Sequence, residues 1–296
     1  MNGVSIHDDI RTVLAGAGVQ GWMHARTLDG NRVVDVDADV SVPTASLYKL
    51  PLLIAFCEMV DARLVDPREQ VRLTSMQRTA GPTGISTLSD DVVMSWRDIA
   101  RLMIAVSDNA AGDAILGLVG VERTNQTLAR LGMRQTRIIG GSADSLRGLT
   151  DDTGARTIAE AFEILADLDR PIDPSAYDPV LSSSTTPSDM THLMAELWNG
   201  RALSAAQSLF AQDLLNGQVW THRIASGFAY DGVRIAGKTG TLGALRHEVA
   251  MVELPDRPPI AVAVFTLPAR PDGRLPRADR AIGDAARLAV RYLLAT

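Results

Sequence analysis

Apolar residues recur at helical spacing at both ends of the chain. Near the start, Ile6, Ile10, Val13 and Leu14 would share one face of a helix, and residues 281–294 show the same pattern near the end. We therefore expect an amphipathic helix at each end, whose apolar face must pack against another part of the protein.

Shorter apolar runs next to these two helices predict β-strands. The turn signal Asp29-Gly30 separates the first two runs, and a proline-containing turn at 255–259 separates the last two. Because strands occur towards both ends of the chain, we expect one antiparallel sheet built from both ends. The expected strands are residues 19–26, 33–36, 232–236, 247–254 and 260–267.

The middle of the chain has mostly helical periodicity. Ser95 is placed to cap one helix, and Thr186-Pro187 begins another with a capping threonine and a proline in the first turn. Further helices are expected at 46–62, 110–118, 122–131, 155–168 and 205–216. Segments rich in glycine, proline or polar residues are expected to be irregular at 72–89, 138–150 and 170–184.

This order of elements predicts an α+β fold, with an antiparallel sheet flanked by the terminal helices and an all-helical part inserted between the strands. We assign residues 1–43 and 218–296 to an α/β sheet domain and residues 44–217 to a helical domain. The length of 296 residues suits one large domain or two closely packed ones.

Composition and charge exclude several classes of protein. Hydrophobic residues make up 46% of the chain and charged residues 22%, as in ordinary soluble proteins, and the net charge of −6 disfavours nucleic acid as the main partner. Cys57 is the only cysteine, so no intrachain disulfide can form. The N-terminus lacks signal-peptide features and no apolar run could span a membrane, so we expect a cytoplasmic protein, or a secreted one if a leader was removed.

Ser46 and Lys49 form the first candidate for chemistry. They lie three residues apart at the start of a strongly apolar helix, a spacing that puts both side chains on one face. A serine hydroxyl needs a base to act as a nucleophile, and burial can lower the pKa of a lysine enough for it to serve. An ordinary surface lysine near a helix start is the alternative.

The second candidate is Ser107-Asp108-Asn109, at a predicted helix end. A serine there can pass a proton to a leaving group, and the asparagine amide can bind a substrate carbonyl and also hold a lysine. A helix C-cap followed by a turn is the alternative.

The third candidate is Gly237-Lys238-Thr239-Gly240-Thr241, where a strand is expected. Its glycines would let a substrate approach the strand edge, and Lys238 could bind a carboxylate and hold Ser107 in place. The N–H groups of Thr241 and Ser46 could together bind an oxyanion. It is not a phosphate loop, because the upstream glycine is missing and no helix follows; a glycine-rich turn with a solvated lysine is the alternative.

Together the three motifs, in this order, resemble the set found in class A β-lactamases and penicillin-binding proteins, and class A most closely. The resemblance covers nearly the whole chain, including the helix start at Thr186-Pro187. It implies that Ser46 is an acylated nucleophile, that Lys49 is its general base and that Ser107 carries a proton to the leaving nitrogen. The substrate-binding residues that it implies are Asn109, Lys238, Thr239, Gly240, Thr241 and Arg246.

Arg246 matches a strand position where many relatives carry a carboxylate-binding arginine, although a solvated strand arginine is an equal alternative. The resemblance further implies a site at the junction of the two domains, a β-lactam, peptide or ester as substrate, and no metal or cofactor. We expect a monomer. Two alternatives remain: an esterase, amidase or peptidase of a biosynthetic pathway, and a penicillin-binding protein that is acylated with little turnover.

The chain departs from class A enzymes where these carry the glutamate that activates the deacylating water. The lead-in Thr136-Arg137-Ile138 places that position near Ser142, and no glutamate occurs between Arg123 and Ala159. The segment from Asn109 to Thr186 is also longer than usual by roughly one helix. Asp144, Asp151 or Asp152 could substitute, although each is more simply a loop or cap carboxylate.

Overall fold

A five-stranded antiparallel sheet is the centre of the fold. The computed structural model describes residues 5–167, 169, 172–228, 230–268 and 274–295. The strand order is β2-β1-β9-β8-β7, so the two ends of the chain meet in one sheet, and the predicted fold class is confirmed. The strands are β1 (Val19–Thr27), β2 (Val33–Val36), β7 (Arg234–Leu242), β8 (Leu245–Glu253) and β9 (Ile260–Pro268).

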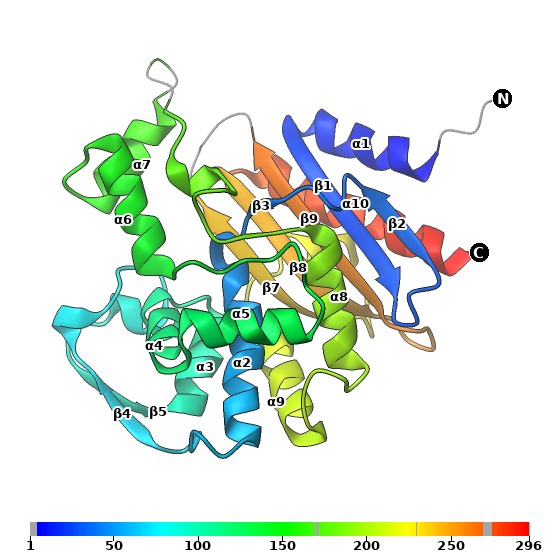
Figure 1. Cartoon of the computed structure of the whole chain (residues 1–296). Helices are drawn as coiled ribbons and strands as arrows, with labels where there is room; N and C mark the ends of the chain where they lie inside the picture. The colour runs from blue at the N-terminus through cyan, green and yellow to red at the C-terminus, as the bar shows by residue number, and fades with distance from the viewer. Residues whose placement is uncertain (1–4, 168, 170–171, 229, 269–273, 296) are drawn as a thin grey trace.

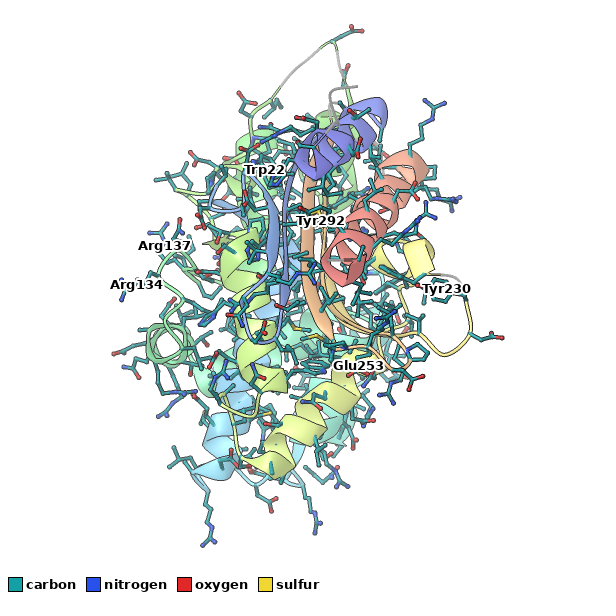
Figure 2. The ribbon with its side chains drawn as sticks, turned by 90° about the vertical axis from the view of Figure 1, so that its right-hand side faces the viewer. Trp22, Arg134, Arg137, Tyr230, Glu253 and Tyr292 are labelled. Carbon is teal, nitrogen blue, oxygen red and sulfur yellow. The ribbon has the colours of Figure 1, made fainter. Side chains whose placement is uncertain are left out.

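The terminal helices α1 (Ile6–Gly16) and α10 (Pro276–Ala295) cover one face of this sheet, as Figure 1 and the turned view in Figure 2 show. Their apolar residues and those of β1, β2, β8 and β9 form one buried cluster. The short 3₁₀ segment η5 (Ile224–Phe228) packs closely on α10. Gly227 permits this approach, since a Cβ there would lie 2.2 Å from the carbonyl oxygen of Gly283.

Eight further helices lie within the described residues, and α8 packs directly on the other face of the sheet (Figure 2). None of the helices within the described residues is long and apolar enough to cross a membrane. Their bounds are α2 (Lys49–Asp61), α3 (Trp96–Ala105), α4 (Asn109–Val119), α5 (Val121–Arg130), α6 (Ser142–Thr153), α7 (Ile158–Ala166), α8 (Pro187–Trp198) and α9 (Ala205–Asn216).

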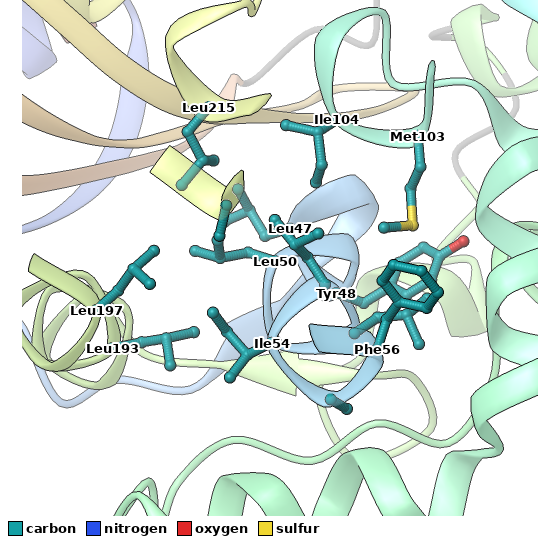
Figure 3. Packing of buried hydrophobic residues seen from close by; sticks show 14 of the residues in the cluster. Leu47, Tyr48, Leu50, Ile54, Phe56, Met103, Ile104, Leu193, Leu197 and Leu215 are labelled. Carbon is teal, nitrogen blue, oxygen red and sulfur yellow. The ribbon is translucent and has the colours of Figure 1, made fainter. Parts of the chain in front are cut away.

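Helix α2 lies at the centre of the helical part because it is apolar on all sides. Its residues Leu50 and Ile54 are fully buried and lie beside leucines of α8 and α9 (Figure 3). Each such side chain contributes about 1.5–3 kcal/mol relative to an exposed one. Cys57 on the same helix is also buried, as expected, and burial raises the pKa of its thiol well above the usual value.

The predicted helix starts are confirmed. The Ser95 hydroxyl accepts from the N–H of Asp98, and the Thr186 hydroxyl accepts from the N–H of Asp189, with Pro187 in the first turn. Two short ladders, β3 (Val42–Pro43) with β6 (Ser184–Thr185) and β4 (Gln70–Leu73) with β5 (Val92–Ser95), were not predicted.

The prediction of an irregular segment at 138–150 is wrong, because α6 begins at Ser142. The carboxylate of Asp113 on α4 accepts hydrogen bonds from the N–H groups of Ser142 and Ala143, and so caps this helix from another part of the chain. Leu149 is buried between α6 and α7 in a small separate core. A tertiary cap and a tertiary core therefore form this helix in spite of its glycine-rich start.

The segment at 72–89 is only partly irregular, since β4 covers its first residues and the 3₁₀ segments η2 (Ser75–Gln77) and η3 (Gly84–Thr87) follow. The segment at 170–184 contains the 3₁₀ segment η4 (Ser175–Tyr177) and β6. Residues 1–4 lie outside the described residues. So do residue 168, the expected end of the helix at 155–168, and residues 170 and 171, the expected start of the irregular segment at 170–184.

Candidate active site

Ser46 lies in the 3₁₀ segment η1 (Ala45–Tyr48), one turn before Lys49, the first residue of α2. Lys49 is fully buried, and its Nζ lies 3.3 Å from Ser46 Oγ, 2.7 Å from the Ser107 carbonyl oxygen and 3.0 Å from Asn109 Oδ1. Burial lowers the pKa of Lys49 to about 8, although the nearby carboxylates of Asp113 and Asp108 act in the opposite direction. The first two motifs therefore meet at one buried amine.

Ser107 links the second motif to the third. It lies between α3 and α4 with a backbone φ of +59°, a left-handed conformation that non-glycine residues seldom adopt and that often marks functional sites. Its hydroxyl accepts from Lys238 Nζ at 2.8 Å, as the sequence suggested. Burial, followed by repulsion from Lys49, holds the pKa of Lys238 well below its usual value.

Asp108, the middle residue of the second motif, holds this region together. Its buried carboxylate accepts from the N–H of Ala110 at the start of α4 and from Ile85 N–H and Ser86 Oγ in η3. The distances are 3.0, 2.5 and 2.8 Å. Gly84 is required beside it, because a Cβ there would lie 2.3 Å from the carboxylate.

Strand β7 packs directly on η1. A Cβ at Gly240 would lie 3.0 Å from the carbonyl oxygen of Thr44, so glycine suits this close approach. The N–H of Thr239 donates to Gln218 Oε1 at 2.6 Å and therefore points away from β8; Thr241, two residues on, has its N–H on the same side. Strand β7, at the edge of the sheet, therefore directs these two N–H groups away from β8, and it also contacts η1, where Ser46 lies.

Arg246 is only 3% exposed, so it is not a solvated strand arginine. It lies on β8 opposite Thr241, and its Nη1 donates to the carbonyl oxygens of Gly243 and Leu245. Burial lowers its pKa. Its contact with a substrate carboxylate stays a prediction.

Arg223, which the sequence analysis did not select, lies under the same strand. Its guanidinium donates to the Gly240 carbonyl oxygen at 2.9 Å, to Thr241 Oγ1 at 2.8 Å and to Asp279 Oδ1 at 2.7 Å. The residue is 3% exposed. It stands in an irregular segment without a motif, so nothing in the sequence distinguished it.

Asp113 was also missed, although it lies one turn after Asn109 on α4, a spacing that places both on one face. Besides capping α6, it accepts from Thr79 Oγ1 at 2.6 Å and from the Tyr48 hydroxyl at 3.3 Å. Burial, and then the charge of Asp113, raises the pKa of Tyr48 well above its usual value.

Ser142, the residue near the expected glutamate position, does contact the site. Its hydroxyl donates to Asn109 Oδ1 at 3.0 Å and lies 2.9 Å from the Tyr48 hydroxyl. The Tyr48 hydroxyl donates to Asp113 and accepts from the N–H of Ser142, whose hydroxyl donates to Asn109, so hydrogen bonds connect Asp113 to Asn109 and Lys49.

The three aspartates proposed as substitutes have other partners in the structure. Asp144 accepts from the N–H of Gly141 and pairs with Arg147 at 3.5 Å, and Asp152 accepts from the N–H and hydroxyl of Ser175. Asp151 is exposed on α6. These contacts cap and connect α6 and η4, and a role in deacylation stays a prediction. No group of three or more His, Cys, Asp and Glu side chains in the described part of the chain is arranged to hold a metal ion.

The chain belongs to the β-lactamase enzyme family, whose model matches residues 5–293. It is 29% identical over 306 residues to the β-lactamase regulatory protein BlaB of Streptomyces cacaoi, with 97% of each chain covered. Its fold is similar to a β-lactamase from Sphaerobacter thermophilus (24% identity, TM-score 0.77, 97% of both chains). It is also similar to a PBP-A variant solved as an acyl-enzyme with penicillin G (20% identity, TM-score 0.78, 98% and 97%).

Proposed function

We propose that this protein is a serine hydrolase that reacts with β-lactams, or with related amides and esters, through an acyl-Ser46 intermediate. The observation that carries the proposal is the buried amine of Lys49, placed between Ser46 Oγ, the Ser107 carbonyl and Asn109 Oδ1. With a pKa near 8, an appreciable fraction of this amine is neutral at physiological pH and can accept the Ser46 proton.

In acylation, Ser46 Oγ loses its proton to Lys49 and forms a bond to the carbonyl carbon of the substrate. The N–H groups of Ser46 and Thr241 would bind the negative charge that develops on the carbonyl oxygen. The bond from that carbon to the leaving nitrogen then breaks, and the proton reaches this nitrogen through Ser107. Lys238 orients the Ser107 hydroxyl for this transfer.

Substrate binding would use the remaining polar groups around Ser46. One N–H of the Asn109 amide donates to the Ala80 carbonyl oxygen, which leaves its second N–H for a substrate carbonyl. Arg223 and Arg246 would give the region positive charge suited to a substrate carboxylate, to which the Lys238 amine and the Thr239 hydroxyl could donate.

A second candidate is a penicillin-recognising protein that is acylated but turns over slowly, in a sensory or regulatory role. The Ser142 hydroxyl favours it, because this group donates to Asn109 and cannot act as a base for water at neutral pH. The name of the Streptomyces relative points the same way. An esterase, amidase or peptidase acting in a biosynthetic pathway is compatible with the same residues.

Nitrocefin hydrolysis combined with intact-mass spectrometry distinguishes these candidates. Rapid hydrolysis with mostly unmodified protein indicates a β-lactamase, and a stoichiometric mass increase with little turnover indicates the penicillin-recognising protein. No reaction with nitrocefin, but Ser46-dependent cleavage of p-nitrophenyl esters, indicates an esterase. Absence of any Ser46-dependent acylation contradicts the proposal.

A further inference from the structure

A hollow of about 690 Å³ lies at the end of the sheet where β1 ends and β9 begins. Figure 1 shows the turns at these two strand ends side by side. The strand β1 is three positions away from β7 in the sheet, so the hollow is separate from the proposed reaction centre. Its volume suits a small organic molecule. The lining includes Arg26, Leu28, Arg32, Asn199, Arg201 and Pro258.

The walls of the hollow come from three segments that are joined to one another. Asn199, directly after α8, donates from its Nδ2 to the carbonyl oxygen of Leu28 in the turn after β1, at 3.0 Å. Thr27, the last residue of β1, lies opposite Ile260, the first residue of β9. This pairing brings Pro258, in the turn before β9, to the same place. The hollow is therefore a formed feature of the fold.

Arg26 on β1 is the unusual side chain of this lining. It forms no hydrogen bond or ion pair with any described residue, and its Nε is the one buried side-chain nitrogen or oxygen in the described part of the chain that has no partner. The turn after β1 packs closely on the guanidinium, since a Cβ at Gly30 would overlap Arg26 Nη2. A buried donor without an acceptor is costly. An acceptor from a ligand would remove this cost.

The positive charge of the lining is not balanced by ion pairs. Arg201 pairs with Glu196 at 2.5 Å. Arg32 donates to the backbone carbonyl oxygen of Tyr292 at 3.1 Å, a partner that carries no charge. Among the described residues, no carboxylate forms an ion pair with Arg26 or Arg32. Two guanidinium groups therefore line the hollow without a counter-charge in contact.

Asp29, the carboxylate of the lining, is bound within its own turn. Its Oδ1 accepts from Thr27 Oγ1 at 2.6 Å and from the N–H of Asn31 at 3.1 Å, and its Oδ2 accepts from Asn31 Nδ2 at 3.0 Å. The hydrogen bond from Thr27, above all, lowers the pKa of Asp29, so this group is ionised at neutral pH. Its single charge offsets only one of the two unpaired arginines, and a positive charge remains.

The other lining groups suit the apolar part of a ligand. Leu28 and Pro258 present apolar side chains, and the arginine stems add methylene groups. A guanidinium can hold a carboxylate or a phosphate through two parallel hydrogen bonds, and its flat face can also stack on an aromatic ring. Both halves of an amphipathic anion would thus find partners in one hollow.

We propose that this hollow binds a small organic anion, whose carboxylate or phosphate group accepts hydrogen bonds from Arg26 and Arg32 and whose apolar body lies against Leu28 and Pro258. The ligand is not the substrate that acylates Ser46, because the hollow lies at a different edge of the sheet. Its binding requires no reaction, and this inference goes beyond the proposed function.

The first test is an NMR titration of the whole protein with phenyl phosphate, phenylacetate, inorganic phosphate and 2-phenylethanol. We expect phenyl phosphate or phenylacetate to shift the amide signals of Leu28 and Asn199 saturably, and the one that binds more tightly identifies the head group. The uncharged 2-phenylethanol should bind at least about tenfold more weakly, because it lacks the charge-assisted hydrogen bonds. Absence of these shifts with both organic anions would overturn the proposal. So would equal affinity for 2-phenylethanol, or for inorganic phosphate, which lacks the apolar body.

Variants of the two unpaired arginines provide the second test. Arg26→Gln and Arg32→Gln should each weaken binding of the organic anion by about tenfold or more. Arg26→Lys should also weaken it, because it keeps the charge but loses the paired donors. Arg68→Gln, at an exposed arginine outside the lining, is the matched control and should bind as the wild type does. Unchanged binding in both glutamine variants contradicts the proposal.

A variant of the reaction centre separates this inference from the proposed function. The reaction centre is itself expected to bind a carboxylate, so Lys238→Ala should leave the shifts at Leu28 and Asn199 intact. Their loss in Lys238→Ala, together with their persistence in Arg26→Gln, would place the anion at the reaction centre and contradict the proposal. If β-lactams never acylate the protein but the shifts that depend on Arg26 occur, the proposed function fails and the anion site stands.

Discussion

Replacement of Asp113 by asparagine tests whether this carboxylate controls Lys49. The Asp113 charge favours protonated Lys49, against the stronger effect of burial, and the pKa is about 8 when both act. Without the charge the pKa should fall, so neutral Lys49 becomes more abundant at pH 7. At a pKa of 8 about one tenth of the lysine is neutral at pH 7, so the acylation rate at that pH can rise by at most about tenfold.

The same substitution also weakens the structure around α6. Four described groups donate hydrogen bonds to the Asp113 carboxylate. They are Ser142 N–H, Ala143 N–H, Thr79 Oγ1 and the Tyr48 hydroxyl. An asparagine NH₂ group would face two of them, at a cost of about 1–3 kcal/mol in the free energy of unfolding. The melting temperature should fall, and the high-pH plateau of the acylation rate should drop if Ser142 no longer supports Asn109.

The assay is the rate of acylation by penicillin G between pH 5.5 and 10, followed by intact mass. Wild-type protein should show one rising transition near pH 8, and Asp113→Asn should shift it to lower pH. Asp9→Asn, an exposed position on α1, controls for the change in net charge and should leave the profile unchanged. A wild-type transition near the ordinary lysine pKa, or an unshifted transition in Asp113→Asn, would refute the reasoning.

Three further predictions concern Ser46, the pair Lys238 and Arg246, and Glu248. Ser46→Ala should abolish labelling by a fluorescent penicillin with little change in melting temperature; persistent labelling would place the nucleophile elsewhere. Lys238→Ala and Arg246→Ala should raise KM more for substrates with a carboxylate than for neutral esters, because a charged hydrogen bond contributes about 1.5–3 kcal/mol; equal losses would show that neither binds the carboxylate. Burial raises the pKa of Glu248 to about 7, so its protonated form is favoured in the fold. Stability should therefore fall as the pH rises from about 4.5 to 7, and Glu248→Gln should flatten the melting-temperature profile in that range, whereas an unaltered slope would assign the dependence to other groups.

The sequence analysis succeeded where the signal is local. The spacing of Ser46 and Lys49, the capping residues and the apolar runs of the strands depend on neighbours in the chain, and the structure agrees with them. The contact between Lys238 and Ser107 was suggested by the third motif, but it forms through tertiary packing of β7 against the residue between α3 and α4. That packing could not be calculated from residue spacing.

The features that were missed depend on contacts between distant segments. Helix α6 is capped by Asp113 from α4, so the glycines before it predicted a loop. Arg223 is a single residue in an irregular stretch and gains its place because η5, which begins at the next residue, packs on α10 and β8. Neither has a periodic or spaced pattern that sequence reasoning could use.

The central expectation is that β-lactams acylate Ser46 readily and that the acyl-enzyme persists. The groups for acylation are assembled, whereas Ser142 stands near the position where a general base for water was expected. Loss of a positioned base typically costs about 10²–10⁴-fold in rate. Product release should therefore show a burst of about one equivalent followed by a slow phase.

Intact-mass spectrometry during that slow phase is the most direct measurement. We expect the protein to be mostly one acyl group heavier, with the added mass on the peptide that contains Ser46. Fast steady hydrolysis with mostly unmodified protein would contradict this expectation. Asp144→Asn, Asp151→Asn and Asp152→Asn would then identify the carboxylate that activates water, since the one that restores the burst marks it.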